Sequence, residues 1–312
     1  MSWLTETLNI QYPIIQGGMA NIATGAFAAA VSNAGALGLI GSGGMNAEQL
    51  AEEIRIAKEN TDKPFGVNLM LMNPDADRIA QLLADEKIPV ITTGAGNPGK
   101  YMEKWKAAGS IVIPVAASVA LAKRMVRAGA DAVIAEGTES GGHVGEMTTM
   151  TLVPQMVDAL DVPVIAAGGI ADGRQMAAVM ALGASGIQVG TCLLASEECP
   201  IHENYKQAII EAGDNATVVT GRSVNAPVRV LKNNMTRTYL KKEREGADRM
   251  ELEKYTLGSL RRAVFDGDTR DGSLMAGQVC GQLKQIRPLA EIFADMCSQR
   301  DAVISGLQEI LV

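Results

Sequence analysis

Residues Val164–Gly173 read VIAAGGIADG, and residues Gln188–Thr191 read QVGT. Each stretch begins as a short apolar run, typical of a buried strand, and ends in a glycine turn. In a barrel of βα units, the loops after the seventh and eighth strands commonly bind phosphate through backbone N–H groups. The two stretches therefore predict the last strands of a barrel and a phosphate site. Ordinary tight turns, which any barrel needs, are the alternative interpretation.

Similar apolar runs precede these two, and helical patterns such as Met45–Glu59 and Val119–Ala128 separate them. Runs that are apolar on both faces and alternate with helices indicate parallel strands covered by helices. Such units can close as a barrel or lie open as a doubly wound sheet. The expected strands are Pro13–Ile15, Leu37–Ile40, Phe65–Leu71, Val90–Thr93, Ile111–Val115, Ala132–Ala135, Pro163–Ala167 and Gly186–Val189.

Glycines directly after the expected strands favour the barrel. In a barrel these positions form one ring at the C-terminal face, where the active site lies and where a flat ligand needs close approach of the backbone. We therefore predict an α/β fold, a TIM (β/α)8 barrel. The glycines concerned are Gly17, Gly18, Gly41, Gly43, Gly44, Gly94, Gly96, Gly137, Gly141, Gly142, Gly168, Gly169 and Gly190.

The alternation of strands and helices stops after the eighth strand. The polar, charged stretch 196–270 predicts a helical insertion or cap, and the final stretch regains a helical pattern with Leu289, Ile292, Phe293 and Met296. We expect residues 1–195 and 271–312 to form the barrel, with residues 196–270 as the cap segment.

Composition limits the class of protein. The chain has 312 residues, of which 47% are hydrophobic and 20% charged, the balance of a compact globular protein. Its four cysteines and two histidines offer no metal-ligand spacing, so we expect no metal site. No apolar run reaches membrane-spanning length, and the first residues lack a signal-peptide pattern. We expect a cytoplasmic protein with no nucleic-acid or membrane partner.

Two polar side chains stand out as candidates for chemistry. His143 lies between glycines on a long loop after the sixth strand, Glu136–Glu146, where it could donate a proton or hydrogen bond to a substrate. A solvated loop histidine is the alternative. Asn68 interrupts the apolar third strand, and its amide requires either a ligand atom or a structural partner. His202 lies in the polar segment, where we expect no functional role.

Two further features are weaker signals. Gly94–Gly99 formally matches the dinucleotide pattern G-x-G-x-x-G, but the next strand ends in Val115-Ala116-Ala117 and lacks the acidic residue that would hold a ribose. We expect this loop to line a cofactor or substrate site. Cys192 has no adjacent base in the sequence and is interpreted as a small packing residue.

Several motifs in register resemble one family. The chain is similar to the nitronate monooxygenase/2-nitropropane dioxygenase superfamily of FMN barrels and, within it, to the FMN-dependent enoyl-acyl-carrier-protein reductase II branch of bacterial fatty acid synthesis. Glu136 stands where the monooxygenase branch carries Gln, which favours the reductase branch. The motifs are YPIIQGGMA (Tyr12–Ala20), DKPFGVN (Asp62–Asn68), TTGAGNP (Thr92–Pro98), IAEGTESGGHVG (Ile134–Gly145), VPVIAAGGIADG (Val162–Gly173), QVGT (Gln188–Thr191) and GSLMAGQ (Gly272–Gln278).

The resemblance implies FMN as cofactor and His143 as the active-site histidine. It places Gly18 and Met19 near the isoalloxazine ring and assigns the glycine turns to the ribityl phosphate. The residues that it implies for cofactor binding are Gly18, Met19, Asn68, Glu136, Gly141, Gly142, Gly168, Gly169, Gln188, Val189, Gly190 and Thr191. Departures from the reductase pattern are Asn21, Ala116, Ala117, Cys192 and Leu193, which put acyl-chain specificity in question.

The resemblance further implies reduction of a trans-2-enoyl thioester by NADH or NADPH through FMN. A nitronate monooxygenase and a non-catalytic flavin-binding protein are the alternatives, and a homodimer is expected. The expected partner is an acyl carrier protein, which is acidic. Residues 222–262 carry a net charge of +6 in a chain of −7, and we predict that they steer the carrier to the barrel. The candidates are Arg229, Lys232, Lys241, Lys242 and Arg244.

Overall fold

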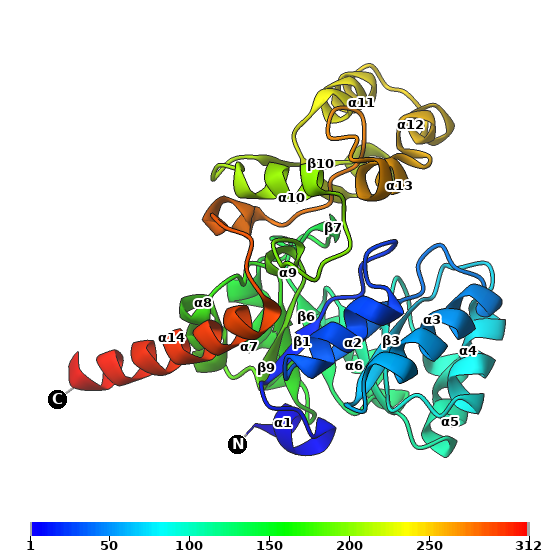
Figure 1. Cartoon of the computed structure of the whole chain (residues 1–312). Coiled ribbons are helices and arrows are strands. Elements are labelled where there is room, and N and C mark those ends of the chain that lie inside the picture. The colour runs from blue at the N-terminus through cyan, green and yellow to red at the C-terminus, as the bar shows by residue number, and fades with distance from the viewer. Residues whose placement is uncertain (1, 311–312) are drawn as a thin grey trace.

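The structure, a computed structural model, describes residues 2–310. Eight parallel strands form a barrel in the order β1-β9-β8-β6-β5-β4-β3-β2 (Figure 1). β1 and β2 close it through Leu37, whose N–H donates to the Ile14 carbonyl and whose carbonyl accepts from the Gln16 N–H, both at 2.9 Å. The barrel strands are β1 (Ile14–Gln16), β2 (Gly38–Gly41), β3 (Phe65–Met70), β4 (Val90–Gly94), β5 (Ile111–Ala116), β6 (Val133–Glu136), β8 (Val164–Ala167) and β9 (Gly186–Val189).

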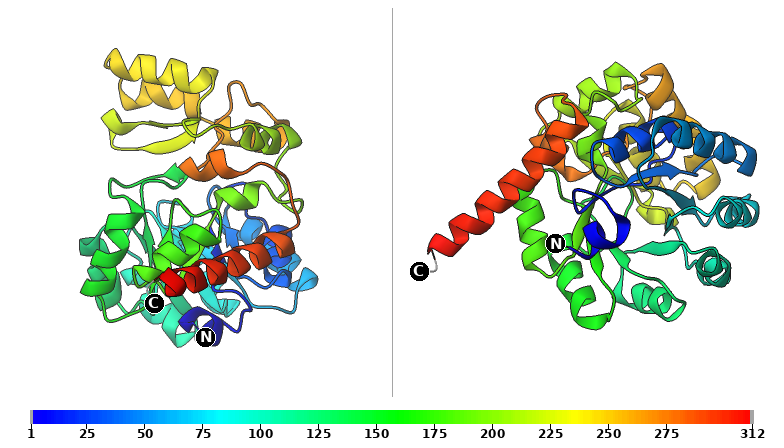
Figure 2. Two further views of the ribbon diagram at one scale, coloured as in Figure 1. Left: turned by 90° about the vertical axis from the view of Figure 1, so that its left-hand side faces the viewer. Right: turned by 60° about the horizontal axis from the view of Figure 1, so that its bottom comes forward.

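The barrel and its expected strands are thereby confirmed. Helices follow the strands and form an outer ring, seen from below in Figure 2. The ring helices are α2 (Gly25–Asn33), α3 (Ala47–Asn60), α4 (Ala76–Asp85), α5 (Gly99–Ala107), α6 (Val119–Arg127), α7 (Thr149–Ala159) and α8 (Gly173–Ala181). The helix that follows β9, α9 (Thr191–Leu194), has only four residues, and α14 (Leu289–Ile310) packs against α8. Gly173 permits this packing, because a Cβ there would clash with the Met296 carbonyl.

Two buried layers hold the barrel together. One cluster includes Ile15, Leu39, Ile113, Ile134 and Ile165 from five of the barrel strands, and α1 (Trp3–Leu8) contributes Leu4 and Leu8 to it. The neighbouring strand positions, such as Ile14 and Ile40, belong to a second cluster that includes the helices. This alternation follows from strand geometry, in which successive side chains point to opposite faces. Both faces are therefore apolar, which is why the strands read as continuous apolar runs.

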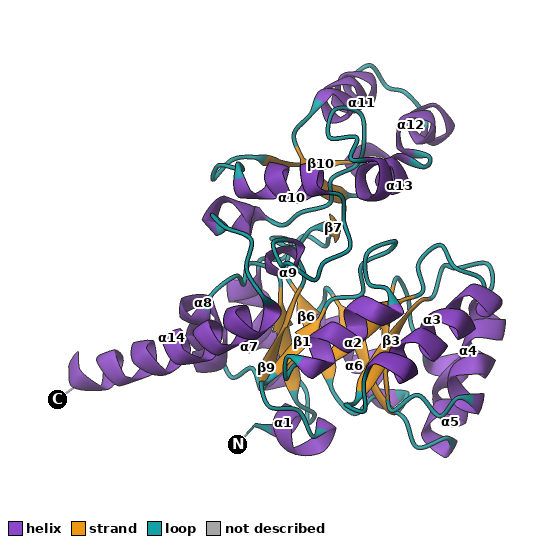
Figure 3. Cartoon of the chain, viewed as in Figure 1, coloured by secondary structure: helices purple, strands orange, loops and turns teal. Residues whose placement is uncertain are grey.

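The segment after β9 forms a cap over the C-terminal ends of the strands (Figure 1). It contains the expected helices and also two strands that the sequence did not predict. Together with β7, a two-residue strand from the loop after β6, they form a three-stranded antiparallel sheet in the order β10-β11-β7 (Figure 3). The elements are β7 (Gly142–His143), α9 (Thr191–Leu194), α10 (Glu203–Ile210), β10 (Thr217–Thr220), η1 (Arg222–Val224), β11 (Val228–Leu231), α11 (Asn234–Arg244), α12 (Arg249–Thr256), α13 (Ser259–Arg261), η2 (Arg262–Asp266) and η3 (Gln278–Gln282).

Among residues 2–310, no helix combines the length and apolar character needed to cross a membrane. The same residues hold no cluster of three or more His, Cys, Asp or Glu side chains suited to a metal ion. The division of the chain at residues 195/196 and 270/271 stays a prediction.

Candidate active site

A cavity of about 450 Å³ lies at the C-terminal ends of the barrel strands, beneath the cap. This volume is within the range of small-molecule and cofactor sites. The glycine turns form its floor, and the cap contributes Asn225–Pro227, Leu260 and Met275 to its wall. Most of the other lining side chains are apolar. The cavity therefore suits a ligand with a large apolar portion and a few polar attachment points.

One end of the cavity is rich in free backbone donors. Gly168 and Gly169 have φ of +89° and +74°, a left-handed conformation that glycine adopts readily. Within residues 2–310, the N–H groups of Gly168, Gly169, Gly190 and Thr191 donate no hydrogen bond to another protein group. A Cβ on Gly168 would lie 2.7 Å from the Gly137 carbonyl oxygen, so the turn needs glycine. Converging free N–H groups of this kind form an anion site.

Gly18 and Asn68 border the cavity on the side of β1 and β3. Gly18 packs so closely on the Asn68 side chain that a Cβ at Gly18 would clash with it. The Asn68 amide is held in place because its Oδ1 accepts from the Thr92 hydroxyl at 2.9 Å. That contact leaves the Asn68 Nδ2 donor for a ligand. Met19 lies beside Gly190, in the turn after β9.

Glu136 lies in the wall of the cavity at the end of β6. Burial raises the pKa of its carboxyl group to about 7, and the nearby Ser140 hydroxyl partly opposes the shift. The Ser140 Oγ is buried, and within the described part of the chain it has no hydrogen-bond partner. A carboxyl group that holds a proton near neutral pH and an unpaired hydroxyl thus face the same space.

His143 reaches the cavity from β7. β7 pairs with β11, with His143 opposite Val228, so the cap sheet determines the backbone position of this histidine. Its side chain is accessible from the cavity, and burial of the surrounding site lowers its pKa. The neutral imidazole is therefore favoured at pH 7, and it can still donate one ring N–H.

Glu139 is a site residue that the sequence did not reveal. Its carboxylate accepts the Thr149 N–H at 3.0 Å, at the first residue of α7, where a negative charge is favourable. The Thr149 hydroxyl in turn donates to the Gly168 carbonyl at 2.8 Å. Glu139 thus links the histidine loop to the glycine turn after β8. Thr149 and Gly168 lie 10 and 29 residues further along the chain, and this spacing matches no known motif.

Comparison with known proteins identifies the family. The nitronate monooxygenase family profile matches residues 1–85 and 75–299. The chain belongs to the nitronate monooxygenase family. A solved structure of FabK from Thermotoga maritima is 47% identical, covers 99% of both chains and has a TM-score of 0.97.

Two curated relatives carry different activities. One is (3aS,4S,5R,7aS)-5-hydroxy-7a-methyl-1-oxo-octahydro-1H-indene-4-carboxyl-CoA dehydrogenase of Rhodococcus jostii, 38% identical over 74% of this chain and 66% of its own length. The other is a probable nitronate monooxygenase of Staphylococcus saprophyticus, 34% identical over 88% of this chain and 91% of its own. Both names are those of oxidoreductases, as is the name of the family. Together they indicate an oxidoreductase.

In this nitronate monooxygenase family member, one cavity brings together every residue that the sequence singled out for cofactor binding or catalysis. They all line it: Gly18, Met19, Asn68, Glu136, Gly141, Gly142, His143, Gly168, Gly169, Gln188, Val189, Gly190 and Thr191. Their individual roles stay predictions. Gly94 and Ala95 from the GAGNPG loop also line the cavity, as expected.

The five departures from the reductase pattern do not line the cavity. Asn21 adopts a left-handed conformation with φ of 62°. Ala117 packs against Gly145. A Cβ on Gly145 would lie 2.6 Å from the Ala117 Cβ, so both residues must be small. Cys192 is buried, in agreement with the interpretation as a packing residue, and burial raises the pKa of its thiol to about 12. Ala116 and Leu193 are buried as well.

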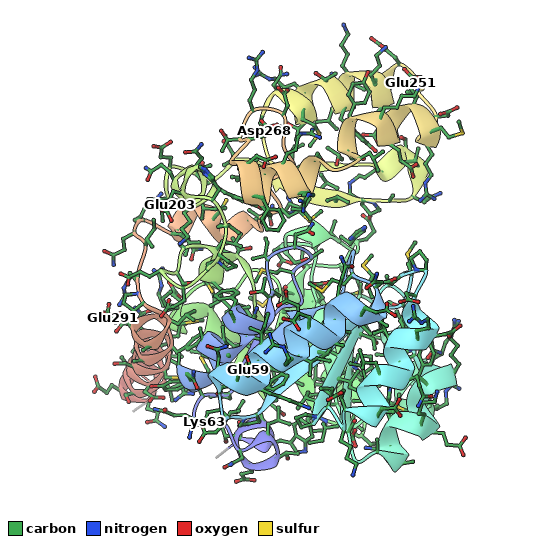
Figure 4. The ribbon with its side chains drawn as sticks, turned by 45° about the vertical axis from the view of Figure 1, so that its right-hand side comes forward. Glu59, Lys63, Glu203, Glu251, Asp268 and Glu291 are labelled. Atoms are coloured by element: carbon green, nitrogen blue, oxygen red, sulfur yellow. The ribbon has the colours of Figure 1, made fainter. Side chains whose placement is uncertain are left out.

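The structure corrects the set of cap residues expected to steer a carrier. Arg229 is buried, with 7% of its surface exposed, so it takes no part in an electrostatic surface. Lys242 is paired with Glu245 and lies 3.8 Å from Glu251, an acidic residue of the cap that is visible in Figure 4. Lys232, Lys241 and Arg244 remain exposed on the cap, and the Lys241 Nζ lies 3.9 Å from Glu245 Oε1. His202 accepts the Asn204 N–H at 3.1 Å and caps α10, a structural role.

Proposed function

We propose that the protein is an enoyl-acyl-carrier-protein reductase that uses FMN and NADH or NADPH. The likeness to FabK, an enoyl-acyl-carrier-protein reductase, carries this assignment, because it spans 99% of both chains at 47% identity. The named substrate of the Rhodococcus jostii relative is also a thioester, of coenzyme A. An apolar cavity with few charged groups is consistent with an acyl substrate.

The residues present fit FMN. The free N–H groups of the turns after β8 and β9 would hold its phosphate. Gly18, Met19 and Asn68 would border the ring, since the bare backbone at Gly18 allows close approach. When bound, FMN would accept a hydride from the nicotinamide cofactor and deliver it to the enoyl substrate. The protein contributes position, exclusion of water and control of protons.

His143 and Glu136 are the groups able to act on protons. A neutral His143 donates a ring N–H, which suits the oxygen of a thioester as negative charge develops there. Glu136, with its raised pKa, holds a proton near neutral pH and lies in the same cavity. We assign His143 to the substrate and Glu136 to the cofactor side.

A nitronate monooxygenase is the second candidate, favoured by the Staphylococcus saprophyticus relative at 34% identity. The two functions need different substrates. A reductase consumes reduced nicotinamide and a crotonyl thioester in equal amounts. A monooxygenase consumes a nitronate and O2 and needs no nicotinamide.

The assay therefore compares the two substrate pairs on the purified protein with FMN supplied. We expect turnover of crotonyl thioester with NADH or NADPH that exceeds turnover of alkyl nitronate with O2. Nitronate turnover alone would assign the protein to the second candidate. No turnover of either, with FMN bound, would indicate a flavin-binding protein without this catalysis.

A further inference from the structure

The sequence of the loop that carries His143 does little to restrict its backbone conformation. Between Thr138 and His143 it contains two glycines, Gly141 and Gly142, and Gly142 has a φ of +76°. Glycine allows such a conformation but does not enforce it. The loop must therefore take its shape from contacts with other segments.

One such contact is a buried arginine of the cap. Arg229 lies on β11 opposite Gly142, and its guanidinium extends to the other end of the loop. Nε and Nη2 both donate to the Thr138 carbonyl oxygen, at 3.1 and 3.0 Å. Nη1 donates to the Thr217 hydroxyl on β10 at 3.2 Å. Arg229 thus holds the loop at Thr138 through its side chain and at Gly142 through its backbone.

Burial of the Arg229 guanidinium costs free energy of folding. Within residues 2–310 Arg229 forms no direct ion pair; burial and the like charge of Arg222 lower the pKa of its guanidinium, and the more distant Glu139 opposes them in part. A buried charge without a direct ion pair destabilises a protein unless its donors are well satisfied. The planar fork of arginine satisfies them on a backbone carbonyl, which a lysine ammonium cannot imitate.

Other contacts show that the loop is held from several sides but has no substitute for Arg229. The Gln278 N–H donates to the Glu139 carbonyl at 2.9 Å, and the Thr138 N–H donates to the Met147 carbonyl at 2.7 Å. Neither contact reaches the Thr138 carbonyl oxygen. Arg229 itself does not line the cavity, so it touches neither cofactor nor substrate.

We infer that Arg229 is a positioning residue that fixes the His143 imidazole at the cavity by tying the histidine loop to the cap sheet. The role in turnover rests on the proposed function, whereas the positioning itself does not. It follows that the cap is part of the active-site architecture. The cap and the histidine loop are expected to loosen together when this link is removed.

The chain offers an unusually direct test, because its only histidines are His143 and His202. The imidazole C–H signals of the flavoprotein are followed by NMR as a function of pH in the unmodified protein and in Arg229→Met and Arg229→Lys. We expect both variants to raise the pKa of His143 toward its ordinary value, because the site would admit water. The His202 signal, from the N-terminus of α10, serves as the internal control and should not move.

The two variants separate position from charge. Arg229→Lys keeps the positive charge but loses the fork, so a positioning role predicts a His143 shift in both variants. A shift in Arg229→Met alone would overturn the inference in favour of a charge effect, and no shift in either would overturn it outright. The other charged groups near the loop, Glu136, Glu139 and the Arg222–Glu146 ion pair, are unchanged in both.

A third variant guards against misfolding of the first two. Thr217 is a half-buried residue of β10, and Thr217→Val removes only its hydrogen bond with Arg229 Nη1. This variant should shift the pKa of His143 in the same direction but by less. If Arg229→Met does not fold, Arg229→Lys and Thr217→Val decide the question by the same readout. An unmoved His143 signal in both would then count against the inference.

Turnover gives an independent readout through a double-mutant cycle with His143→Ala. We expect Arg229→Met to lower crotonyl thioester turnover roughly 10- to 100-fold and to cause little further loss in the His143→Ala background, since coupled residues are non-additive. Flavin reduction by the nicotinamide cofactor should change less than twofold. Additive losses would contradict the coupling. Absence of enoyl turnover in the unmodified protein would reject the proposed function. The NMR titration would still test the positioning role of Arg229, because it does not depend on turnover.

Discussion

At the residue scale, Glu136 and His143 face one cavity and are both biased toward their neutral forms. Burial raises the pKa of Glu136 and lowers that of His143, because a poorly hydrated site disfavours either charge. With both groups neutral, Glu139 is the remaining acidic group of the described cavity lining, and its carboxylate is bound by the Thr149 N–H. The sequence indicated His143 because it lies between glycines on a long loop, whereas Glu136 came from the family resemblance. It could not predict Glu139 or Arg229, whose importance depends on partners distant in the chain.

Glu136→Gln tests the raised pKa. A raised carboxyl pKa contributes stability that is fully present below the unfolded value of 4.5 and is lost as the pH rises through about 7. Glutamine has no such dependence. Relative to the unmodified protein, Glu136→Gln should therefore gain stability between pH 5 and pH 8, by at most about 3 kcal/mol. Urea unfolding at the two pH values measures this, and an equal difference at both would rule out the shift.

His143→Ala tests the assignment of the histidine to the substrate. General acid–base and hydrogen-bonding groups typically contribute roughly 10²- to 10⁴-fold, so enoyl turnover should fall within that range. FMN content and flavin reduction by NADH should change little. His202→Ala is the matched control and should cost about 1 kcal/mol of stability at the α10 cap with no loss of turnover. Unchanged enoyl turnover in His143→Ala would remove it from the mechanism.

At the element scale, the barrel strands were predicted to within one residue at each end, because runs apolar on both faces are typical of parallel strands. β7, β10 and β11 were missed. They have two to four residues each, and β7 pairs with a strand more than eighty residues away in the chain. Such short strands form only through pairing with their partner strands, and the local sequence does not indicate which distant segments pair.

The turn after β8 gives a prediction at this scale. Gly168→Ala would strain a φ of +89° and place a Cβ 2.7 Å from the Gly137 carbonyl, so it should displace the free N–H groups and weaken FMN binding at least roughly tenfold. Gly109→Ala is the control, because Gly109 has a φ of +86° with open space around it and lies before β5, away from the cavity. FMN titration followed by fluorescence compares the two. Equal affinities would argue against a phosphate site at Gly168.

At the scale of the whole molecule, the basic residues of the cap bear on the carrier protein. Lys232, Lys241 and Arg244 are exposed there, whereas Lys63 lies on the barrel far from the cap (Figure 4). We predict that reversing the three cap charges to Glu lowers kcat/KM for a carrier-linked enoyl substrate, with a steep salt dependence, and affects a coenzyme A-linked substrate much less. Lys63→Glu should change neither. Equal losses on both substrates would contradict docking at the cap.

The central claim is that one cavity passes a hydride from reduced nicotinamide to an enoyl thioester through FMN. Its most direct test is the visible absorption spectrum of the FMN-loaded protein under anaerobic conditions. NADH or NADPH should bleach the flavin band, and crotonyl thioester added afterwards should restore it in equal amount, with butyryl thioester as the product. A flavin that stays oxidised with both nicotinamides, or that is bleached but not restored by the thioester, would contradict the account.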